Sequence, residues 1–182
     1  MRVLAGTLKN RELKTPKGDK TRPTSAKVRG SLFDILQGEI QEATFLDLFA
    51  GSGAMGIEAL SRGANSATFV EKERGAAKVL RSNLENLSLT EKSTLIQTDV
   101  TAALKRLKSK RDTFDIIYID PPYSLPITTL LETISTLLTP SGVLIIEQRK
   151  GSEITPAHMT LTSKRAYGDT LLLFFSKRSS LD

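Results

Sequence analysis

A short apolar strand that runs into a glycine-rich turn and then a helix is the feature that most constrains the fold of this 182-residue chain. Phe45–Asp47 reads as the strand, Gly51, Gly53 and Gly56 form the turn, and Ile57–Arg62 continues as a helix. This order predicts the first βα unit of an open α/β sheet, in which glycines let the backbone approach a nucleoside-bearing ligand. The spacing matches the G-x-G-x-x-G fingerprint, so a hydride-transferring NAD domain has to be considered.

Acidic side chains close or follow four expected strands. Three further apolar runs read as parallel strands, at residues 67–70, 94–97 and 114–119. The acids at the four strand ends are Asp47, Glu71, Asp99 and Asp120. Because the carboxyl ends of parallel strands meet at one edge of a sheet, these acids predict an acidic rim there. Such a rim would repel a pyrophosphate and suits a cationic sulfonium, which favours S-adenosylmethionine over NAD.

The strand-end acids suggest separate roles around this cofactor. Glu71 follows the second strand, where an acid usually accepts hydrogen bonds from a ribose diol. Asp99 would face the adenine amine, and Asp47 the amino-acid ammonium or a bound water. For the glycine turn, the alternative is a tight strand-to-helix turn that serves packing alone. The candidate cofactor-binding residues are Asp47, Phe49, Gly51, Ser52, Gly53, Glu71, Lys72, Asp99 and Val100.

The run Asp120-Pro121-Pro122-Tyr123 ends the fourth strand, where open α/β sheets bind ligands. The chemistry of these residues suits the transfer of a chemical group to a planar exocyclic amine. Asp120 can accept a hydrogen bond from the amine, the carbonyl of Pro121 offers a second acceptor, and Tyr123 supplies a face on which a base can stack. A strand-ending turn is the simpler alternative, because Pro-Pro is a common breaker. The candidate catalytic residues are Asp120, Pro121, Pro122 and Tyr123.

The positive charge of the chain is concentrated at its N-terminus. The net charge is +6; residues 1–30 hold nine basic and two acidic residues, which leaves 17 basic and 18 acidic residues in 31–182. A basic segment beside a nearly neutral body is typical of a nucleic-acid enzyme, although a solvated charged tail is the simpler alternative. The candidate substrate-binding residues are Arg2, Lys9, Arg11, Arg22, Thr24, Lys27 and Arg29.

The basic segment has the pattern of folded structure. Val3-Leu4 and Leu13 can pair as a short hairpin across Lys9-Asn10, and Thr24 or Ser25 would then cap a helix. The apolar face of that helix is expected to hold Val28, Leu32, Ile35 and Leu36.

The remaining elements complete the α/β pattern. Helices are expected at residues 74–87, 101–107 and 126–138, and a fifth strand at 142–147. Two runs, 159–165 and 170–177, read as a closing hairpin that inserts one antiparallel strand. The basic run Lys105–Arg111 ends a helix, where cations are favourable, so we interpret it first as structural and second as RNA-binding.

Composition excludes several classes of protein. There is no cysteine, which rules out disulfides, thiol nucleophiles and cysteine-ligated zinc. The single histidine, His158, is expected to have a surface or packing role, and no His-Asp-Ser set suggests a hydrolase. No apolar run approaches the about 20 residues of a membrane helix, and no signal-peptide core is visible. We expect a cytoplasmic protein that contacts no membrane and needs no metal.

Over nearly its whole length the sequence resembles the class I methyltransferases that modify the exocyclic N2 amine of guanine in bacterial 16S ribosomal RNA, the RsmD family. The glycine turn and Asp120-Pro-Pro-Tyr123 are shared widely among amino methyltransferases, whereas Arg22-Pro-Thr24 in its basic surroundings narrows the resemblance. Further matching segments are Arg2–Gly6, Val28-Arg29, Leu32-Phe33, Leu46–Gly53, Glu58–Ala64, Phe69–Glu71, Asn83-Leu84 and Tyr167–Thr170. Gly30 departs from the family, whose members usually carry a charged residue there.

The resemblance implies a Rossmann-like α/β fold with a seven-stranded, mostly parallel sheet and one antiparallel strand from the C-terminal hairpin. Residues 1–40 would form a small RNA-facing extension and residues 41–182 the methyltransferase domain, the two acting as a single domain. It further implies that a monomer transfers a methyl group from S-adenosylmethionine to guanine N2 of 16S ribosomal RNA, within a partly or fully assembled small subunit.

Two alternatives remain open at this point. An N6-adenine methyltransferase of DNA or RNA would share the same core, although a DNA enzyme normally adds a target-recognition domain for which this chain has no room. A non-enzymatic RNA-binding module would explain the basic segment, but it leaves the glycine turn and Asp120-Pro-Pro-Tyr123 unexplained.

Overall fold

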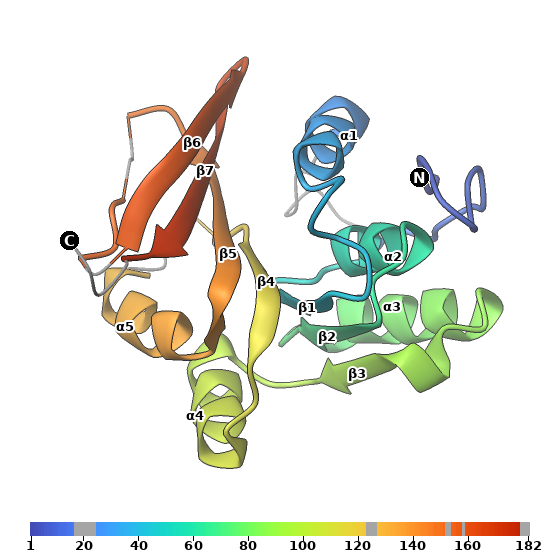
Figure 1. The fold of residues 1–182 in the computed structure, drawn as a ribbon. Coiled ribbons are helices and arrows are strands. Elements are labelled where there is room, and N and C mark those ends of the chain that lie inside the picture. Colours follow the sequence, from blue (N-terminus) through green and yellow to red (C-terminus); the bar gives the residue numbers. More distant parts are fainter. Residues whose placement is uncertain (17–24, 123–126, 152–153, 158, 179–182) are drawn as a thin grey trace. The chain divides into compact units, whose positions relative to one another are not determined.

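The computed structural model describes residues 1–16, 25–122, 127–151, 154–157 and 159–178. They form two compact units, Met1–Val100 and Thr101–Asp182, and each is described by itself. The first unit contains α1 (Ala26–Ile35), β1 (Thr44–Asp47), α2 (Ala54–Ser61), β2 (Ser66–Val70), α3 (Arg74–Asn86), the 3₁₀ turn η1 (Thr90–Lys92) and β3 (Ser93–Ile96). The second contains α4 (Val100–Lys110) apart from its first residue, β4 (Phe114–Ile119), α5 (Thr128–Thr136), β5 (Leu138–Arg149), β6 (Met159–Tyr167) and β7 (Thr170–Lys177) (Figure 1).

Three parallel strands form the core of the first unit. β1 pairs with β2, and β2 pairs with β3, so the carboxyl ends of all three lie at one edge. The side chains of Phe45, Leu46 and Phe69 are fully buried in this layer. α2 begins at Ala54, after Gly51 and Gly53, and it includes Gly56, which was predicted to belong to the turn. The predicted order of strand, turn and helix is therefore confirmed.

Gly53 in the turn and Gly56 in α2 are both needed for close packing. Gly53 has a φ of +83°, and a Cβ there would lie 2.1 Å from Cδ1 of Leu80 in α3. A Cβ at Gly56 would lie 2.3 Å from the Phe69 ring in β2. Both helices therefore pack against the turn and the strands at distances that leave no room for a larger residue.

The N-terminal segment, which we define as residues 1–14, forms the predicted hairpin. The N–H of Val3 donates to the carbonyl of Arg11 at 3.0 Å, and Arg2 and Glu12 form an antiparallel bridge. Asn10 makes the turn with a φ of +68°. Figure 1 shows this segment beside α2.

The helix predicted after the basic segment is α1. The Ser25 hydroxyl accepts a hydrogen bond from the N–H of Val28 at 3.2 Å, which confirms the cap. Leu32 and Leu36 are buried as predicted, but Ile35 is 38% exposed, so its placement on the apolar face was wrong. The buried stripe also includes Phe33, and this shifts its centre and leaves Ile35 at the margin of the helix face.

The second unit combines one parallel strand pair with a hairpin. β4 pairs with β5 in parallel, and β7 lies antiparallel to both β5 and β6. β4 spans the predicted residues, and the predicted closing hairpin is present. β5 extends well beyond the predicted residues 142–147, and α4 is longer than the predicted 101–107.

The seven strands belong to one sheet in the order β3-β2-β1-β4-β5-β7-β6. The Rossmann-like, mostly parallel sheet with one antiparallel strand from the C-terminal hairpin is thus confirmed. In the described parts of the chain, no helix combines the length and the apolar character needed to span a bilayer.

Candidate active site

Hydrogen bonds hold the Glu71 carboxylate against the glycine turn, at the carboxyl ends of the strands of the first unit. The N–H of Gly51 donates to Glu71 Oε2 at 2.8 Å, and the N–H of Glu73 donates to Glu71 Oε1 at 2.7 Å. Each oxygen keeps lone pairs for a further donor. The carboxylate is half-buried and held in one orientation, which suits it to accept hydrogen bonds from a vicinal diol.

Asp47 ends β1 at the same edge and is only 1% exposed. Burial raises the pKa of Asp47 from its ordinary value of 3.8 to about 7, a hydrogen bond from the N–H of Phe49 lowers it, and the Glu71 carboxylate raises it. The distance from Phe49 N to Asp47 Oδ1 is 3.3 Å. Asp47 and Glu71 are therefore close enough to interact, as the predicted acidic edge requires, and a bound cation would favour the ionised form of Asp47.

The other candidate cofactor-binding residues lie on the same edge of the first unit. Asp99 and Val100 follow β3; Asp99 is exposed and Val100 is buried. Lys72 is exposed just after Glu71, and Phe49 is half-buried in the glycine turn. A Cβ at Gly51 would meet none of the described atoms within 4 Å, so the turn leaves open space beside its backbone. Parallel pairing thus places all the predicted cofactor residues around one end of three strands.

Asn83 joins the glycine turn to the N-terminal segment. Its Nδ2 donates to the carbonyls of Ser52 at 2.9 Å and Lys14 at 3.0 Å, and its Oδ1 accepts from the N–H of Lys14 at 2.9 Å. The sequence predicted no separate role for Asn83. One feature of the sequence could have indicated a buried polar role for Asn83: it is an amide on the apolar face of α3, which includes Leu80 and Leu84.

The second unit contains the candidate catalytic residues. Asp120 and Pro121 follow β4 and are half-buried, and Pro122 is exposed, whereas Tyr123 lies outside the described residues. Just before them, the hydroxyl of Tyr118 donates to Glu147 Oε2 at 2.6 Å, and both side chains are buried. This bond ties β4 to β5 immediately behind Asp120 and holds the end of the strand that carries it.

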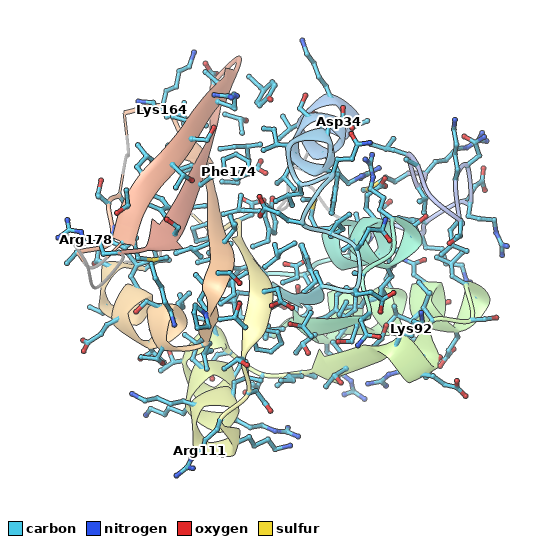
Figure 2. All side chains as sticks on the ribbon, viewed as in Figure 1. Asp34, Lys92, Arg111, Lys164, Phe174 and Arg178 are labelled. Carbon is cyan, nitrogen blue, oxygen red and sulfur yellow. The ribbon has the colours of Figure 1, made fainter. Side chains whose placement is uncertain are left out.

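Four of the predicted substrate-binding residues expose their side chains: Arg2, Lys9, Arg11 and Lys27. Arg2 pairs with Glu12 at 3.0 Å, and Arg11 donates to the carbonyl of Asn86 at 3.2 Å. Arg22 and Thr24 lie outside the described residues, as does His158. The basic run after Leu104 lies along α4 and its end, and Figure 2 shows Arg111 pointing into solvent.

Arg29 is a correction to the prediction. Its side chain is 1% exposed, so it cannot contact RNA in this structure. Its Nε lies 3.5 Å from Glu58 Oε2, and its Nη2 donates to the carbonyl of Arg2 at 2.5 Å. Arg29 therefore stabilises the position of the N-terminal segment through the Arg2 carbonyl, and its charge faces Glu58 and not a substrate.

Glu58 is the centre of this buried contact. Its oxygens accept hydrogen bonds from the N–H groups of Leu4 at 2.8 Å and Ala5 at 3.0 Å, and from Nε of Arg62 at 2.9 Å. A buried carboxylate with two cationic neighbours and two amide donors has its charge compensated. Glu58 thus connects the N-terminal segment to α2. The sequence analysis assigned it no role beyond its place in Glu58–Ala64, a segment that resembles the family.

Comparisons with known proteins cover nearly the whole chain. The sequence model of a protein family described as conserved hypothetical protein 95 matches residues 1–176. A Bacillus subtilis protein named putative rRNA methyltransferase YlbH is 35% identical over 98% of this chain and 100% of its own length. Ribosomal RNA small subunit methyltransferase D of Escherichia coli is 31% identical over 98% of this chain and 91% of its own length.

A solved structure has the same fold. The structure described as the putative methyltransferase yhhF from Escherichia coli superimposes with a TM-score of 0.85 at 28% sequence identity. The alignment covers 99% of each chain. The similarity therefore extends from the N-terminal segment to the C-terminal hairpin.

Proposed function

Because the chain belongs to the family described as conserved hypothetical protein 95 and its relatives are named ribosomal RNA methyltransferases, we propose that it methylates the N2 amine of a guanine in small-subunit ribosomal RNA. The chain is a methyltransferase, and its methyl donor is S-adenosylmethionine. The observation that carries the proposal is the acidic edge formed by Asp47, Glu71 and the glycine turn.

The donor set at this edge fits the cofactor. Glu71 would accept hydrogen bonds from the ribose hydroxyls, because its two oxygens are held in place by the N–H groups of Gly51 and Glu73. Asp47 would be held ionised by the amino-acid ammonium, and Asp99 would accept from the adenine amine. The open space beside Gly51 gives the nucleoside access to the backbone. When bound, the sulfonium supplies an already activated methyl group.

Asp120 and the carbonyl of Pro121 would act on the acceptor. Both are hydrogen-bond acceptors, so they can bind the two N–H groups of an exocyclic amine and direct its lone pair away from them. The positive charge that grows on nitrogen during transfer is stabilised by the Asp120 carboxylate. The proton then leaves through Asp120 or water. The target base has to leave its stack to reach the site, where Tyr123 would stack on it.

Guanine suits these acceptors better than adenine. The N1–H and N2–H groups of guanine are adjacent donors, and a carboxylate offers only acceptors. Adenine instead presents an amine beside an N1 acceptor. This argument favours guanine N2 without excluding the adenine alternative.

The relatives' names and the exposed cations of the N-terminal segment support a further proposal about the RNA substrate. We propose that the protein acts as a monomer without a metal, in the cytoplasm, on RNA within a partly or fully assembled small subunit. Residues 1–40 would be the RNA-facing extension and 41–182 the methyltransferase domain. The exposed cations Arg2, Lys9, Arg11 and Lys27 would contact phosphates.

Identification of the labelled nucleoside tests the function. The purified protein is incubated with tritiated S-adenosylmethionine and either small subunits from a strain lacking its gene or the protein-free RNA from those subunits. Label in N2-methylguanosine is expected, and comparison of the two substrates shows whether assembly is needed. Label in N6-methyladenosine would transfer the protein to the adenine group, and the absence of label in either substrate and in DNA would favour the binding-module alternative.

Asp120→Asn tests the catalytic role. We expect the rate of methyl transfer to fall by about 100-fold or more, because an amide does not stabilise the developing charge as a carboxylate does. Affinity for S-adenosylhomocysteine should change little. Asp112→Asn, which makes the same change just before β4, is the matched control. A rate near that of the wild type for Asp120→Asn would refute the role of the carboxylate.

A further inference from the structure

Asn83 is a buried amide with bonds to two functional parts of the first unit. Its side chain is 1% exposed, and it uses both Nδ2 hydrogens and Oδ1 in bonds of 2.9–3.0 Å. One partner, Ser52, belongs to the glycine turn of the proposed cofactor site. The other, Lys14, ends the N-terminal segment that carries Arg2, Lys9 and Arg11. Asn83 thus bridges parts of the chain that are 31 and 69 residues away from it.

The contacts of Asn83 differ from those of the other side chains that hold the N-terminal segment. Glu58 accepts from Leu4 and Ala5, and the Ser61 hydroxyl donates to the carbonyl of Ala5 at 2.5 Å. Both belong to α2. Asn83 extends from α3, and the side-chain hydrogen bonds that Glu58 and Ser61 make with the described residues do not reach the glycine turn. Among these three side chains, Asn83 is therefore the one that bonds to both the turn and the segment.

The burial of Asn83 makes this bridge energetically significant. An amide among the apolar side chains of α3 is tolerated because its polar atoms are satisfied, and loss of a buried hydrogen bond that leaves its partner unpaired costs about 1–3 kcal/mol. If the Ser52 carbonyl moves, the amide has to follow it, and the bonds to Lys14 move with the amide. The position of the turn and the docking of the segment are thus mechanically linked.

We propose that Asn83 is a positioning residue that couples cofactor binding to RNA binding. The inference rests on the proposed function, since it takes the turn as the cofactor site and the segment as part of the RNA surface. Cofactor binding orders the turn at Ser52, which stabilises the Asn83 amide in the orientation that docks Lys14. A docked segment presents its cations in a fixed arrangement and loses less conformational freedom when RNA binds. By linkage, RNA binding strengthens cofactor binding by the same factor.

Hydrogen exchange measures the link without any methyl transfer. S-adenosylhomocysteine is added to the wild-type protein, and amide exchange is followed in the glycine turn and in residues 1–14. We expect exchange to slow in both, and in particular at the Lys14 N–H, which donates to Asn83 Oδ1. Slowing confined to the turn would overturn the coupling while leaving the cofactor site intact. If exchange slowed nowhere, the proposed function itself would fail.

Two substitutions separate the bridge from general stability. Asn83→Ala removes all three bonds, whereas Asn83→Asp keeps an acceptor for the Lys14 N–H and loses the donors to Ser52 and Lys14. Asn86→Ala is the matched control, because Asn86 lies on the exposed side of the same helix, and the substitution keeps its main-chain carbonyl, which accepts a hydrogen bond from Arg11. Thermal unfolding of each variant establishes that it is folded at the assay temperature.

The affinity for protein-free small-subunit RNA is then measured with and without saturating S-adenosylhomocysteine. We expect the cofactor analogue to tighten RNA binding by about fivefold or more in the wild type and in Asn86→Ala. In both Asn83 variants the ratio should fall towards one. A folded Asn83→Ala or Asn83→Asp protein that keeps the wild-type ratio would overturn the proposal, because a purely structural asparagine would change stability and leave the ratio unaltered.

Discussion

At the scale of single residues, the molecule keeps two carboxylates in contrasting surroundings. Glu58 is fully buried between Arg29 and Arg62, with two amide donors, so its charge is compensated on every side that the described residues show. Asp47 is equally buried but receives one hydrogen bond of 3.3 Å and faces the charge of Glu71. Glu58 thus stabilises the contact between α2 and the N-terminal segment. Burial raises the pKa of Asp47 to about 7, so a bound cation would favour its ionised form.

The raised pKa of Asp47 makes the free energy of unfolding depend on pH. Between pH 3.8 and about 7 the folded protein retains a proton that the unfolded chain has released, so this residue lowers stability as the pH rises through that window. We expect Asp47→Asn to gain stability relative to the wild type from pH 5 to pH 8, by several degrees in Tm, since ~1 kcal/mol corresponds to about 2–4 °C at this size. Thermal unfolding at four pH values checks this, and a difference in Tm between the two proteins that does not change with pH would contradict it.

At the scale of elements, the N-terminal segment depends on its close approach to α2. The N–H of Thr7 donates to the Ser61 carbonyl at 2.8 Å, and the N–H of Leu8 donates to the Ser61 hydroxyl at 3.0 Å. Gly6 permits this approach, because a Cβ there would lie 1.8 Å from the Ser61 carbonyl oxygen, and its φ is +80°. Gly30 in α1 is different, since a Cβ there would make an ordinary 3.7 Å contact with Leu4 Cδ1. The family's usual charged residue is therefore not excluded from that position by the backbone or by Leu4.

Gly6→Ala should release the segment from α2. We expect faster amide exchange at Leu4, Ala5 and Leu8, and a loss of stability of about 2 kcal/mol or more, because both the strained φ and the clash with main chain oppose the substitution. Gly168→Ala is the control: its φ is +60°, and a Cβ there would meet no described atom within 4 Å. It should cost about 1 kcal/mol and leave exchange in residues 1–14 unchanged. Equal effects of the two substitutions would argue against the clash.

At the scale of the whole chain, the excess positive charge and the candidate cofactor and catalytic residues lie in different parts of the sequence. The first 30 residues carry an excess of seven positive charges, whereas the remainder is nearly neutral. The acidic edge of the first unit is built from Asp47, Glu71 and Asp99, which suits a cationic cofactor and would repel RNA phosphates. An RNA-modifying enzyme with such an edge needs a separate basic surface to bind its substrate, and we propose that the exposed cations of the N-terminal segment and α1 provide one.

Removal of two exposed cations should lower the salt dependence of RNA binding. We expect Lys9→Gln with Lys27→Gln to weaken RNA binding and to reduce the slope of log K against log salt by about 2, since each phosphate contact contributes about 1. Lys92→Gln is the control, because Lys92 is exposed at the amino end of β3, opposite the acidic edge (Figure 2). A slope unchanged in the double variant would place the RNA elsewhere on the protein.

Local sequence patterns were enough to predict the helices and strands and the acidic residues at the strand ends. The residues of β4, the glycine turn before α2, the cap at Ser25 and the C-terminal hairpin were all predicted, because apolar periodicity, glycine and proline act over a few neighbouring residues. The acids at the strand ends followed from the same local order. Parallel pairing then placed Asp47, Glu71 and Asp99 at one edge, as expected.

The burial of polar side chains, and the groups that they contact, became visible in the folded chain alone. Arg29 has the sequence surroundings of an RNA-binding cation, yet it lies against Glu58, and Ile35 has those of a core residue, yet it is exposed. Asn83 could not be assigned its bridge, because its partners Lys14 and Ser52 are distant in sequence. Burial depends on the sum of contacts from distant segments, which no local pattern contains. Local patterns therefore predicted the acidic edge, whereas the fold revealed how the glycine turn beside it is connected to the N-terminal segment.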